Sequence, residues 1–397
     1  MINRFISTYQ RLIQSIDFRY HRYIYKRFNI NNRLTGLIGP RGTGKTTLLL
    51  QFIQEHITNK DECIYASIDN IYFSKNLLFD FVSELYEDYG IKYYFLDEIH
   101  KYPNWNQELK NIYDSFPDIH IIFSGSSSMD LVKGTYDLSR RGVLFRIDGM
   151  SFREYLLFNN IATIDIYSLD DILNNRAQVE KDVAHIKKLK GYFKEYLGKG
   201  YYPYILEGSE TYHEKTLRVI EKTIYEDISN YYKLKTENLS YFKKILSYLS
   251  TIPPGELSRN SISKNIGLDN KTIDNYLTIL HETGLIELVK TKQAGSNIFF
   301  LDNPDLYCSI AEQIGFTSKT GTIREIFFIR MLKNAGYTLF YSKKGDFEVD
   351  KYIFEIGGKN KTMKQIKQAG DNAYLVKDDI LYGSRKEVPL YLFGFLY

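Results

Sequence analysis

The chain has 397 residues, 44% of them hydrophobic and 25% charged, which is ordinary for a folded globular protein and excludes a disordered or fibrous chain. Its 52 Lys and Arg against 48 Asp and Glu give a net charge of +4, too small to indicate a nucleic-acid partner by itself. The aromatic fraction of 15% is high, and it fits either stacking surfaces for nucleic acid or the codon usage of an AT-rich genome.

Cysteine usage and hydropathy give further exclusions. Cys63 and Cys308 are far apart and lack the paired spacing of a zinc or redox motif, so we expect reduced thiols in a cytoplasmic protein. The longest apolar run, residues 390–397, is much shorter than the ~18 residues that cross a bilayer, so it is expected in the core, with no membrane partner. The first thirty residues are rich in Arg and Lys, and we predict a basic amphipathic helix on the core rather than a removable leader.

The strongest motif lies between a predicted buried strand, residues 34–38, and a predicted helix, residues 46–56. It fits the phosphate-loop pattern of glycine, four residues, then Gly-Lys-Ser/Thr. In this pattern backbone N–H groups face phosphate oxygens, Lys45 reaches the β and γ phosphates, and the Thr46 hydroxyl ligates Mg²⁺. We therefore expect ATP or GTP to bind, with ATP/ADP and Mg²⁺ as cofactors. The predicted binding residues are Gly39, Pro40, Arg41, Gly42, Thr43, Gly44, Lys45, Thr46 and Thr47.

A second apolar strand, residues 93–96, ends in two carboxylates about fifty residues after the loop. At that place Asp97 is expected to hold Mg²⁺, directly or through water. Glu98 is expected to orient and deprotonate the attacking water as general base, which favours hydrolysis over kinase chemistry.

The next predicted strand, residues 119–123, runs into a serine-rich segment. Ser124 or Ser126 is a candidate to sense the γ-phosphate, and the alternative is a turn that caps a helix starting near Met129. Arg140 and Arg141 follow, and either guanidinium is a candidate to stabilise transition-state charge, in the same chain or across a subunit boundary. A role across a boundary would require a homo-oligomer.

The sequence resembles the prokaryotic AAA-type ATPases that carry a C-terminal winged helix and a restriction-endonuclease-like domain. The resemblance rests on the phosphate loop and on the motifs at residues 96–105, 124–127, 151–155 and 354–359. It implies ATP hydrolysis, and it places the family's arginine on Arg141, with Arg140 where glycine is more usual.

Beyond the motifs, residues 155–235 have helical spacing and are expected to form a helical lid behind the nucleotide site. Residues 239–300 show the order helix, helix, helix and two strands, which is typical of a winged helix-turn-helix with a recognition helix at residues 271–281. Residues 231–300 carry nine Lys or Arg and six Asp or Glu, a balance of only +3. Both DNA contact and protein docking therefore remain open for this part.

The C-terminal part alternates helix and strand, with an extended segment predicted over residues 347–356. Asp350, Glu355 and a lysine resemble the metal-binding set of restriction-type nucleases. Position 357 is Gly where that set has lysine, and Lys359 could replace it only by another backbone path. Asp350 and Glu355 also fall on opposite faces of a regular strand. We therefore expect a nuclease-like fold without cleavage.

Together these features predict an α/β P-loop NTPase core with a doubly wound parallel sheet, followed by three smaller parts. The expected domains are residues 1–155 for the ATPase core, 156–235 for the lid, 236–302 for the winged helix and 303–397 for the nuclease-like part. The main hypothesis is an ATPase that couples hydrolysis to movement of the C-terminal domains. The alternatives are a nucleotide-gated DNA-binding regulator, a DNA-processing nuclease and, more weakly, a P-loop kinase.

Overall fold

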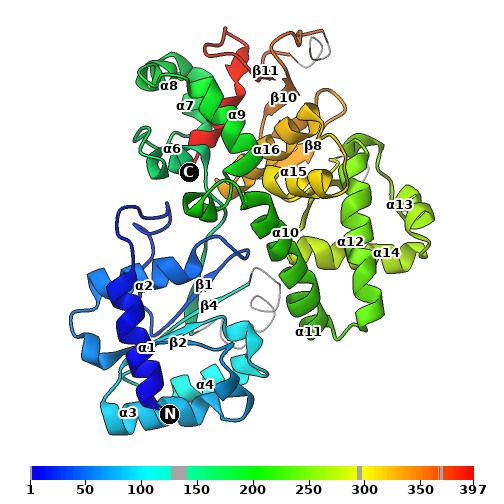
Figure 1. Cartoon of the computed structure of the whole chain (residues 1–397). Coiled ribbons are helices and arrows are strands. Elements are labelled where there is room, and N and C mark those ends of the chain that lie inside the picture. Colours follow the sequence, from blue (N-terminus) through cyan, green and yellow to red (C-terminus); the bar gives the residue numbers. More distant parts are fainter. Residues whose placement is uncertain (1, 127–140, 293–296, 365, 367–369) are drawn as a thin grey trace. The chain divides into compact units, whose positions relative to one another are not determined.

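The computed structural model describes residues 2–126, 141–292, 297–364, 366 and 370–397 (Figure 1). It divides into two compact units, Met1–Asp148 and Gly149–Tyr397. The division falls slightly before the predicted boundary at residue 155, because Tyr196 Oη donates to the carbonyl of Met150 (2.7 Å) and Tyr397 Oη to that of Gly149 (3.1 Å). The finer division of the second unit into three domains stays a prediction.

A five-stranded parallel sheet in the order β2-β3-β4-β1-β5 forms the centre of the first unit. Its inner strands are almost continuously apolar and buried, as expected of a sheet covered on both faces. This confirms the predicted parallel core. The strands are β1 (Leu34–Ile38), β2 (Cys63–Ser67), β3 (Tyr93–Asp97), β4 (His120–Gly125) and β5 (Gly142–Arg146).

The helices of the first unit pack in pairs: α1 lies against α2 and β2, and α3 lies against α4. The predicted amphipathic helix is confirmed, since α1 buries Ile2, Phe5, Tyr9 and Ile13, spaced three or four residues apart on one face. The elements are α1 (Ile2–Ser15), α2 (Lys45–His56), α3 (Leu78–Tyr89) and α4 (Trp105–Ser115), with short 3₁₀ turns η1 (Lys60–Glu62), η2 (Ile71–Ser74) and η3 (Ile99–Lys101).

The second unit begins with helices over the residues where strand patterns are lacking. These are α6 (Phe152–Phe158), α7 (Leu169–Asn174), α8 (Arg176–Val183), α9 (Leu189–Lys199), η4 (Pro203–Glu207), α10 (Tyr212–Lys222), the π-helix η5 (Thr223–Ile228) and α11 (Ser229–Tyr232). Within the unit, the first of them pack on the end of the chain: the ring of Phe152 stacks on Phe395 at 5.8 Å, and Arg153 Nε donates to the Tyr397 carbonyl at 2.9 Å.

Next come helices and an antiparallel hairpin in the order expected from the sequence. They are α12 (Thr236–Thr251), η6 (Pro254–Glu256), α13 (Arg259–Ile266), α14 (Asn270–Glu282), β6 (Ile286–Lys290) and β7 (Asn297–Leu301). The hairpin loop, residues 293–296, lies outside the described residues.

A second five-stranded sheet, in the order β12-β11-β10-β9-β8, ends the chain and is mixed: β8, β9 and β10 are antiparallel, and β10, β11 and β12 are parallel. Two helices precede it, and the apolar run 390–397 is buried, largely in the 3₁₀ helix η8. The elements are α15 (Pro304–Gln313), α16 (Thr320–Asn334), β8 (Leu339–Tyr341), β9 (Phe347–Val349), β10 (Tyr352–Gly357), β11 (Ala373–Lys377), β12 (Glu387–Pro389) and η8 (Leu390–Phe395).

The single extended segment predicted over residues 347–356 is wrong, because the chain reverses at Asp350 and Lys351 between β9 and β10. Asp350 has φ 53°, a left-handed conformation that Asp tolerates in tight turns. Among the described residues, no helix is both long enough and apolar enough to cross a membrane.

A buried ionic cluster joins α16 to the β6–β7 hairpin. The Arg330 guanidinium donates to Glu287 Oε2 (2.9 Å), to Asp302 Oδ1 (2.5 Å) and to the Asp302 carbonyl (2.8 Å). Burial by itself would raise the pKa of Glu287, yet the charges of Arg330 and Lys333 lower this pKa to about 2. All three members of the cluster are less than a tenth exposed, so each charge depends on its partners.

Replacing Arg330 by Met should destabilise the second unit by about 3–5 kcal/mol, because Glu287 and Asp302 would keep buried charges without their main counter-ion. The measurement is thermal unfolding of the full chain. Lys333→Met is the matched control, since the Lys333 side chain is 26% exposed and contacts only Glu287 of the two carboxylates, at 2.6 Å. Equal losses in the two variants would contradict a central role for Arg330.

Candidate functional site

The phosphate loop connects the carboxyl end of β1 to the first turn of α2. Gly42 and Gly44 have φ of 80° and 89°, backbone conformations that favour glycine, and Gly44 immediately precedes the helix. A Cβ at Gly39 would lie 2.0 Å from the Ile147 carbonyl oxygen, so only glycine fits this close approach of two strands' ends. The loop therefore has the conformation that its glycine spacing predicts.

Lys45 and Arg22 hold this loop from two sides. Lys45 Nζ donates to the carbonyls of Gly39 (2.9 Å) and Pro40 (3.0 Å), which keeps the ammonium within the loop. The buried Arg22 guanidinium donates to the Thr43 carbonyl and, at 2.7 Å, to the Asp148 carbonyl. Arg22 was missed by the sequence analysis, since a lone Arg in a basic N-terminal segment carries no motif.

Asp97, at the carboxyl end of β3, is 2% exposed and accepts hydrogen bonds from three hydroxyl groups. Thr46 and Tyr65 each donate to Oδ2 at 2.6 Å, and Ser124 donates to Oδ1. Burial and then the Asp97 charge raise the pKa of Tyr65 above its usual range, so this phenol stays a donor. Tyr65, in the middle of β2, had no sequence signal, because its role depends on the neighbouring strand.

The donor set around Asp97 fits magnesium. Mg²⁺ binds through oxygen ligands, commonly one or two carboxylates together with substrate phosphates and water. The Thr46 hydroxyl and the Asp97 carboxylate lie in contact beside the loop, as that coordination requires. Among the described residues, no group of three or more His, Cys, Asp or Glu could hold a metal ion.

Glu98 follows Asp97 in a left-handed conformation, φ 56°, and its side chain is 21% exposed. Its backbone N–H donates to Ser124 Oγ at 3.1 Å, so the structure brings Ser124, Asp97 and Glu98 together. Glu98 Oε2 lies 3.5 Å from Nε2 of His100. Ser126 is buried, and its backbone N–H faces His100 Nδ1 at 3.4 Å.

The structure does not bring Arg141 to the phosphate loop. Arg141 directly precedes β5, whose first residue Gly142 pairs with Leu34, the first residue of β1. The loop follows the other end of β1, about 16 Å away at ~3.3 Å per residue. Arg141 instead pairs with Asp114 on α4 at 3.2 Å. A role within the same chain is therefore not supported for Arg141, and Arg140 lies outside the described residues.

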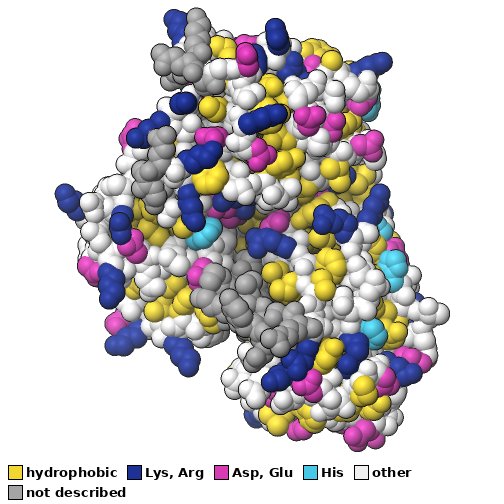
Figure 2. Space-filling model, turned by 180° about the vertical axis from the view of Figure 1, so that it is seen from behind, with side chains coloured by type: hydrophobic (Ala, Val, Ile, Leu, Met, Phe, Trp, Pro, Cys, Tyr) yellow, Lys and Arg dark blue, Asp and Glu magenta, His cyan; other side chains and the backbone are white. Residues whose placement is uncertain are grey.

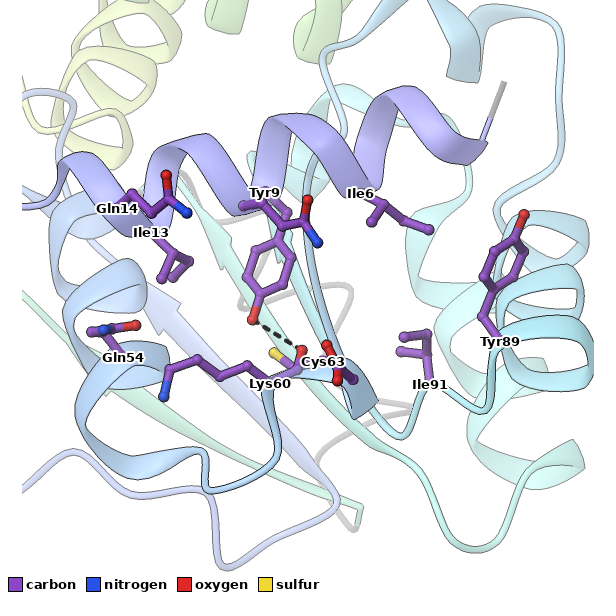
Figure 3. A pocket seen from close by; sticks show the side chains of 11 residues that line it. Ile6, Tyr9, Ile13, Gln14, Gln54, Lys60, Cys63, Tyr89 and Ile91 are labelled. Carbon is purple, nitrogen blue, oxygen red and sulfur yellow. Dashed lines mark hydrogen bonds between the residues drawn. The ribbon is translucent and has the colours of Figure 1, made fainter.

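A cavity of about 510 Å³ lies between α1 and the start of β2, at the same amino end of the sheet (Figure 3). Tyr9 and Cys63 point toward one another in it, and Tyr9 Oη donates to the Lys60 carbonyl at 3.4 Å. Burial raises the pKa of the Cys63 thiol to about 12, which makes it a poor nucleophile. This cavity is far from the phosphate loop and takes no part in the candidate nucleotide site.

In the second unit the carboxylate near Glu355 is Asp346 and not the predicted Asp350. Asp350 lies exposed in the β9–β10 turn, whereas the turn brings Asp346 next to β10, where it accepts the Ile356 N–H at 2.6 Å. Glu355 on β10 is buried, and its partner is Lys361 rather than Lys359, with Nζ 2.6 Å from Oε1. The lysine that position 357 lacks is thus replaced from four residues further on.

The Lys361 side chain passes over Gly357: a Cβ there would lie 2.5 Å from Lys361 Cγ. Glu325 on α16 completes the cluster. Burial and then the charge of Asp346 raise the pKa of Glu325 to about 7. The pKa of Asp346 rises to about 6, mainly through burial and, next among the raising causes, the charge of Glu355.

The predicted recognition helix, α14, shows a mixed surface. Asp269 caps its first turn by accepting the N–H groups of Lys271 and Thr272 at 3.0 Å, and Arg259 of α13 pairs with Asp274. On the face of the molecule in Figure 2, Lys and Arg are interspersed with Asp and Glu. This distribution does not resemble the single-sign surface of a strong DNA binder.

Comparisons with known proteins match two parts of the chain. Residues 31–156 match a family described as an AAA domain, AAA_14, and residues 190–297 match a domain of unknown function, DUF8612. An uncharacterized protein of Methanocaldococcus jannaschii is 29% identical over 373 residues, covering 85% of this chain and 78% of that protein.

Two solved structures also align with the chain. PCH-2 of C. elegans is 18% identical, with a TM-score of 0.27, over 69% of this chain and 68% of its own. AMPPCP-bound DnaA from Aquifex aeolicus is 19% identical, with a TM-score of 0.27, over 65% of this chain and 84% of its own. The AAA-domain match, the parallel sheet and the phosphate loop support an ATPase core of the AAA type in residues 31–156.

Proposed function

We propose that the first unit binds ATP with Mg²⁺ and hydrolyses it to ADP and phosphate. This proposal rests on one observation: Thr46, Asp97 and Glu98 lie together beside the phosphate loop. Thr46 and Asp97 would hold Mg²⁺, which when bound neutralises phosphate charge. Lys45 and the backbone N–H groups of the loop bind the phosphates.

In the proposed reaction the water oxygen forms a bond to the γ-phosphorus as the bond to the β–γ bridging oxygen breaks. Glu98 accepts the proton of the attacking water, and ADP leaves with the bridging oxygen. Glu98 lies directly after the end of β3, next to Asp97, the proposed Mg²⁺ ligand, and this position supports its role as the base.

We further propose that hydrolysis moves the C-terminal unit, and that Arg141 serves the site of a neighbouring copy in a homo-oligomer. Arg141 is 28% exposed and lies at the edge of the sheet opposite to its own phosphate loop, which suits a neighbour rather than its own site. Assembly mass with and without ATP tests this second part, and a monomer in both conditions would refute it.

A nucleotide-gated DNA-binding regulator is the second candidate, favoured by the helix order of residues 236–301. A salt titration of duplex DNA binding, with and without ATP, tests it. Undetectable binding at low salt would eliminate this candidate. For residues 303–397 we propose a nuclease-like part that does not cleave, since the Lys361–Glu355 pair neutralises the carboxylate that a metal would need. Cleavage of DNA or RNA with Mg²⁺ or Mn²⁺ would overturn that proposal.

Glu98→Gln should leave nucleotide binding intact and lower kcat by about 10²–10⁴-fold, because the amide cannot take the proton of water. Steady-state phosphate release and binding of a fluorescent ATP analogue measure the two properties. Glu62→Gln, at the amino end of β2, is the matched control and should retain wild-type kcat. Unchanged turnover in the Glu98 variant would refute the catalytic assignment.

Tyr65→Phe should raise the Mg²⁺ concentration needed for half-maximal ATPase activity about tenfold, because Asp97 loses one of the hydroxyl groups that orient it. Tyr94→Phe is the control, since its hydroxyl donates to the Val82 and Ile91 carbonyls instead. The same Mg²⁺ requirement in both variants would show that the Tyr65 hydroxyl does not matter.

Glu325→Gln should stabilise the protein increasingly as pH rises from 5 to 8. A carboxyl whose folded pKa is raised contributes stability below its unfolded pKa, and this contribution is lost as pH rises through about 7. The gain at pH 8 should reach about 2 kcal/mol. Thermal unfolding at each pH measures it, with the exposed Glu237→Gln as control. A gain independent of pH would contradict the raised pKa.

A further inference from the structure

Glu98 has a neighbour that the proposed reaction does not use. His100 lies on η3, two residues after Glu98, and its side chain is only 6% exposed. Its Nε2 is 3.5 Å from Glu98 Oε2. The left-handed backbone at Glu98 and the 3₁₀ turn after it reverse the chain, so that an imidazole two residues later faces the carboxylate.

The other ring nitrogen of His100 faces β4. The backbone N–H of Ser126, next after the last residue of that strand, donates to Nδ1 at 3.4 Å. A backbone N–H can only donate, so Nδ1 acts as the acceptor and the proton of the neutral ring lies on Nε2. That nitrogen lies beside Glu98 Oε2 at 3.5 Å, a contact that is not a hydrogen bond in this structure, and a small rotation of either side chain would let Nε2 donate to the carboxylate.

We propose that His100 is a positioning residue that fixes the Glu98 carboxylate and ties its orientation to the carboxyl end of β4. This inference rests on the proposed ATPase function. The contact of η3 with β4 supports it, since the ring is held between two backbone segments rather than extending into solvent.

The physical reason is the freedom of a glutamate side chain. Glu98 has three rotatable bonds and is one-fifth exposed, so it samples several orientations unless a fixed donor selects one. General-base catalysis needs the carboxylate within hydrogen-bond reach of water, and small misplacements are costly. A donor supported from β4 would select that orientation, and the strand that carries the candidate sensor residues would thereby be linked to the base.

Three substitutions at His100 test its two ring contacts separately, the one with Glu98 and the one with the Ser126 N–H. Glutamine places an amide nitrogen near the position of Nε2 and keeps a donor for Glu98, whereas asparagine reaches only the position of Nδ1, and alanine keeps neither. His100→Ala and His100→Asn should each lower kcat about 10- to 100-fold with KM for ATP unchanged. His100→Gln should stay within about threefold of wild-type kcat, because it preserves the donor.

The double variant Glu98→Gln, His100→Ala separates positioning from a structural role. Its kcat should equal that of Glu98→Gln alone, because a residue that acts only through Glu98 adds nothing once the base is lost. His120→Ala, at the amino end of β4, is the matched control and should keep wild-type kcat. Binding of a fluorescent ATP analogue reports whether each variant retains a folded site.

The outcomes are distinct. A wild-type protein without ATPase activity would refute the proposed function itself. If the wild type is active and Glu98→Gln is not, unchanged or increased kcat in His100→Ala overturns the positioning role alone. Equal losses in the Gln and Ala variants would also overturn it, as would a change in KM without a change in kcat.

Discussion

The candidate site depends on one carboxylate that collects hydroxyl groups from three other segments. Five parallel strands share one direction, so the ends of β1, β2, β3 and β4 lie along one edge of the sheet. Asp97 at that edge accepts from Thr46 of α2, Tyr65 of β2 and Ser124 of β4. The strand direction brings these groups together, and their hydrogen bonds fix the carboxylate where a phosphate-bound cation would need it.

The same edge explains which candidate residues belong to one site. Glu98 and Ser126 lie at it because each follows a strand's carboxyl end, and His100 joins them through a 3₁₀ turn. Arg141 lies at the opposite edge because it precedes its strand. A position before or after a parallel strand thus separates the residues that lie at the phosphate-loop end of the sheet from those that lie at the other end.

In the second unit, buried carboxylates differ in the cations that surround them. Arg330 pairs with both Glu287 and Asp302, and the charges of Arg330 and Lys333 lower the pKa of Glu287 to about 2. In the cluster around β10, Lys361 pairs with Glu355, and burial raises the pKa values of Glu325 and Asp346. The number of cations within reach decides whether a buried carboxylate remains charged.

The sequence by itself determined the parallel core, the phosphate loop and the helix order of the second half, because these depend on local spacing: apolar runs, paired glycines at left-handed positions and helical periodicity. The placement of Asp97 and Glu98 could be predicted in the same way, because both carboxylates directly follow a predicted apolar strand. Only the tertiary structure decided the partners Arg22, Tyr65 and His100, the position of Arg141, the contact of Asp346 with β10 and the pairing of Lys361 with Glu355. These pairings are made across strands and through turns, where neighbours in space are set by strand order and chain reversal rather than by distance along the sequence.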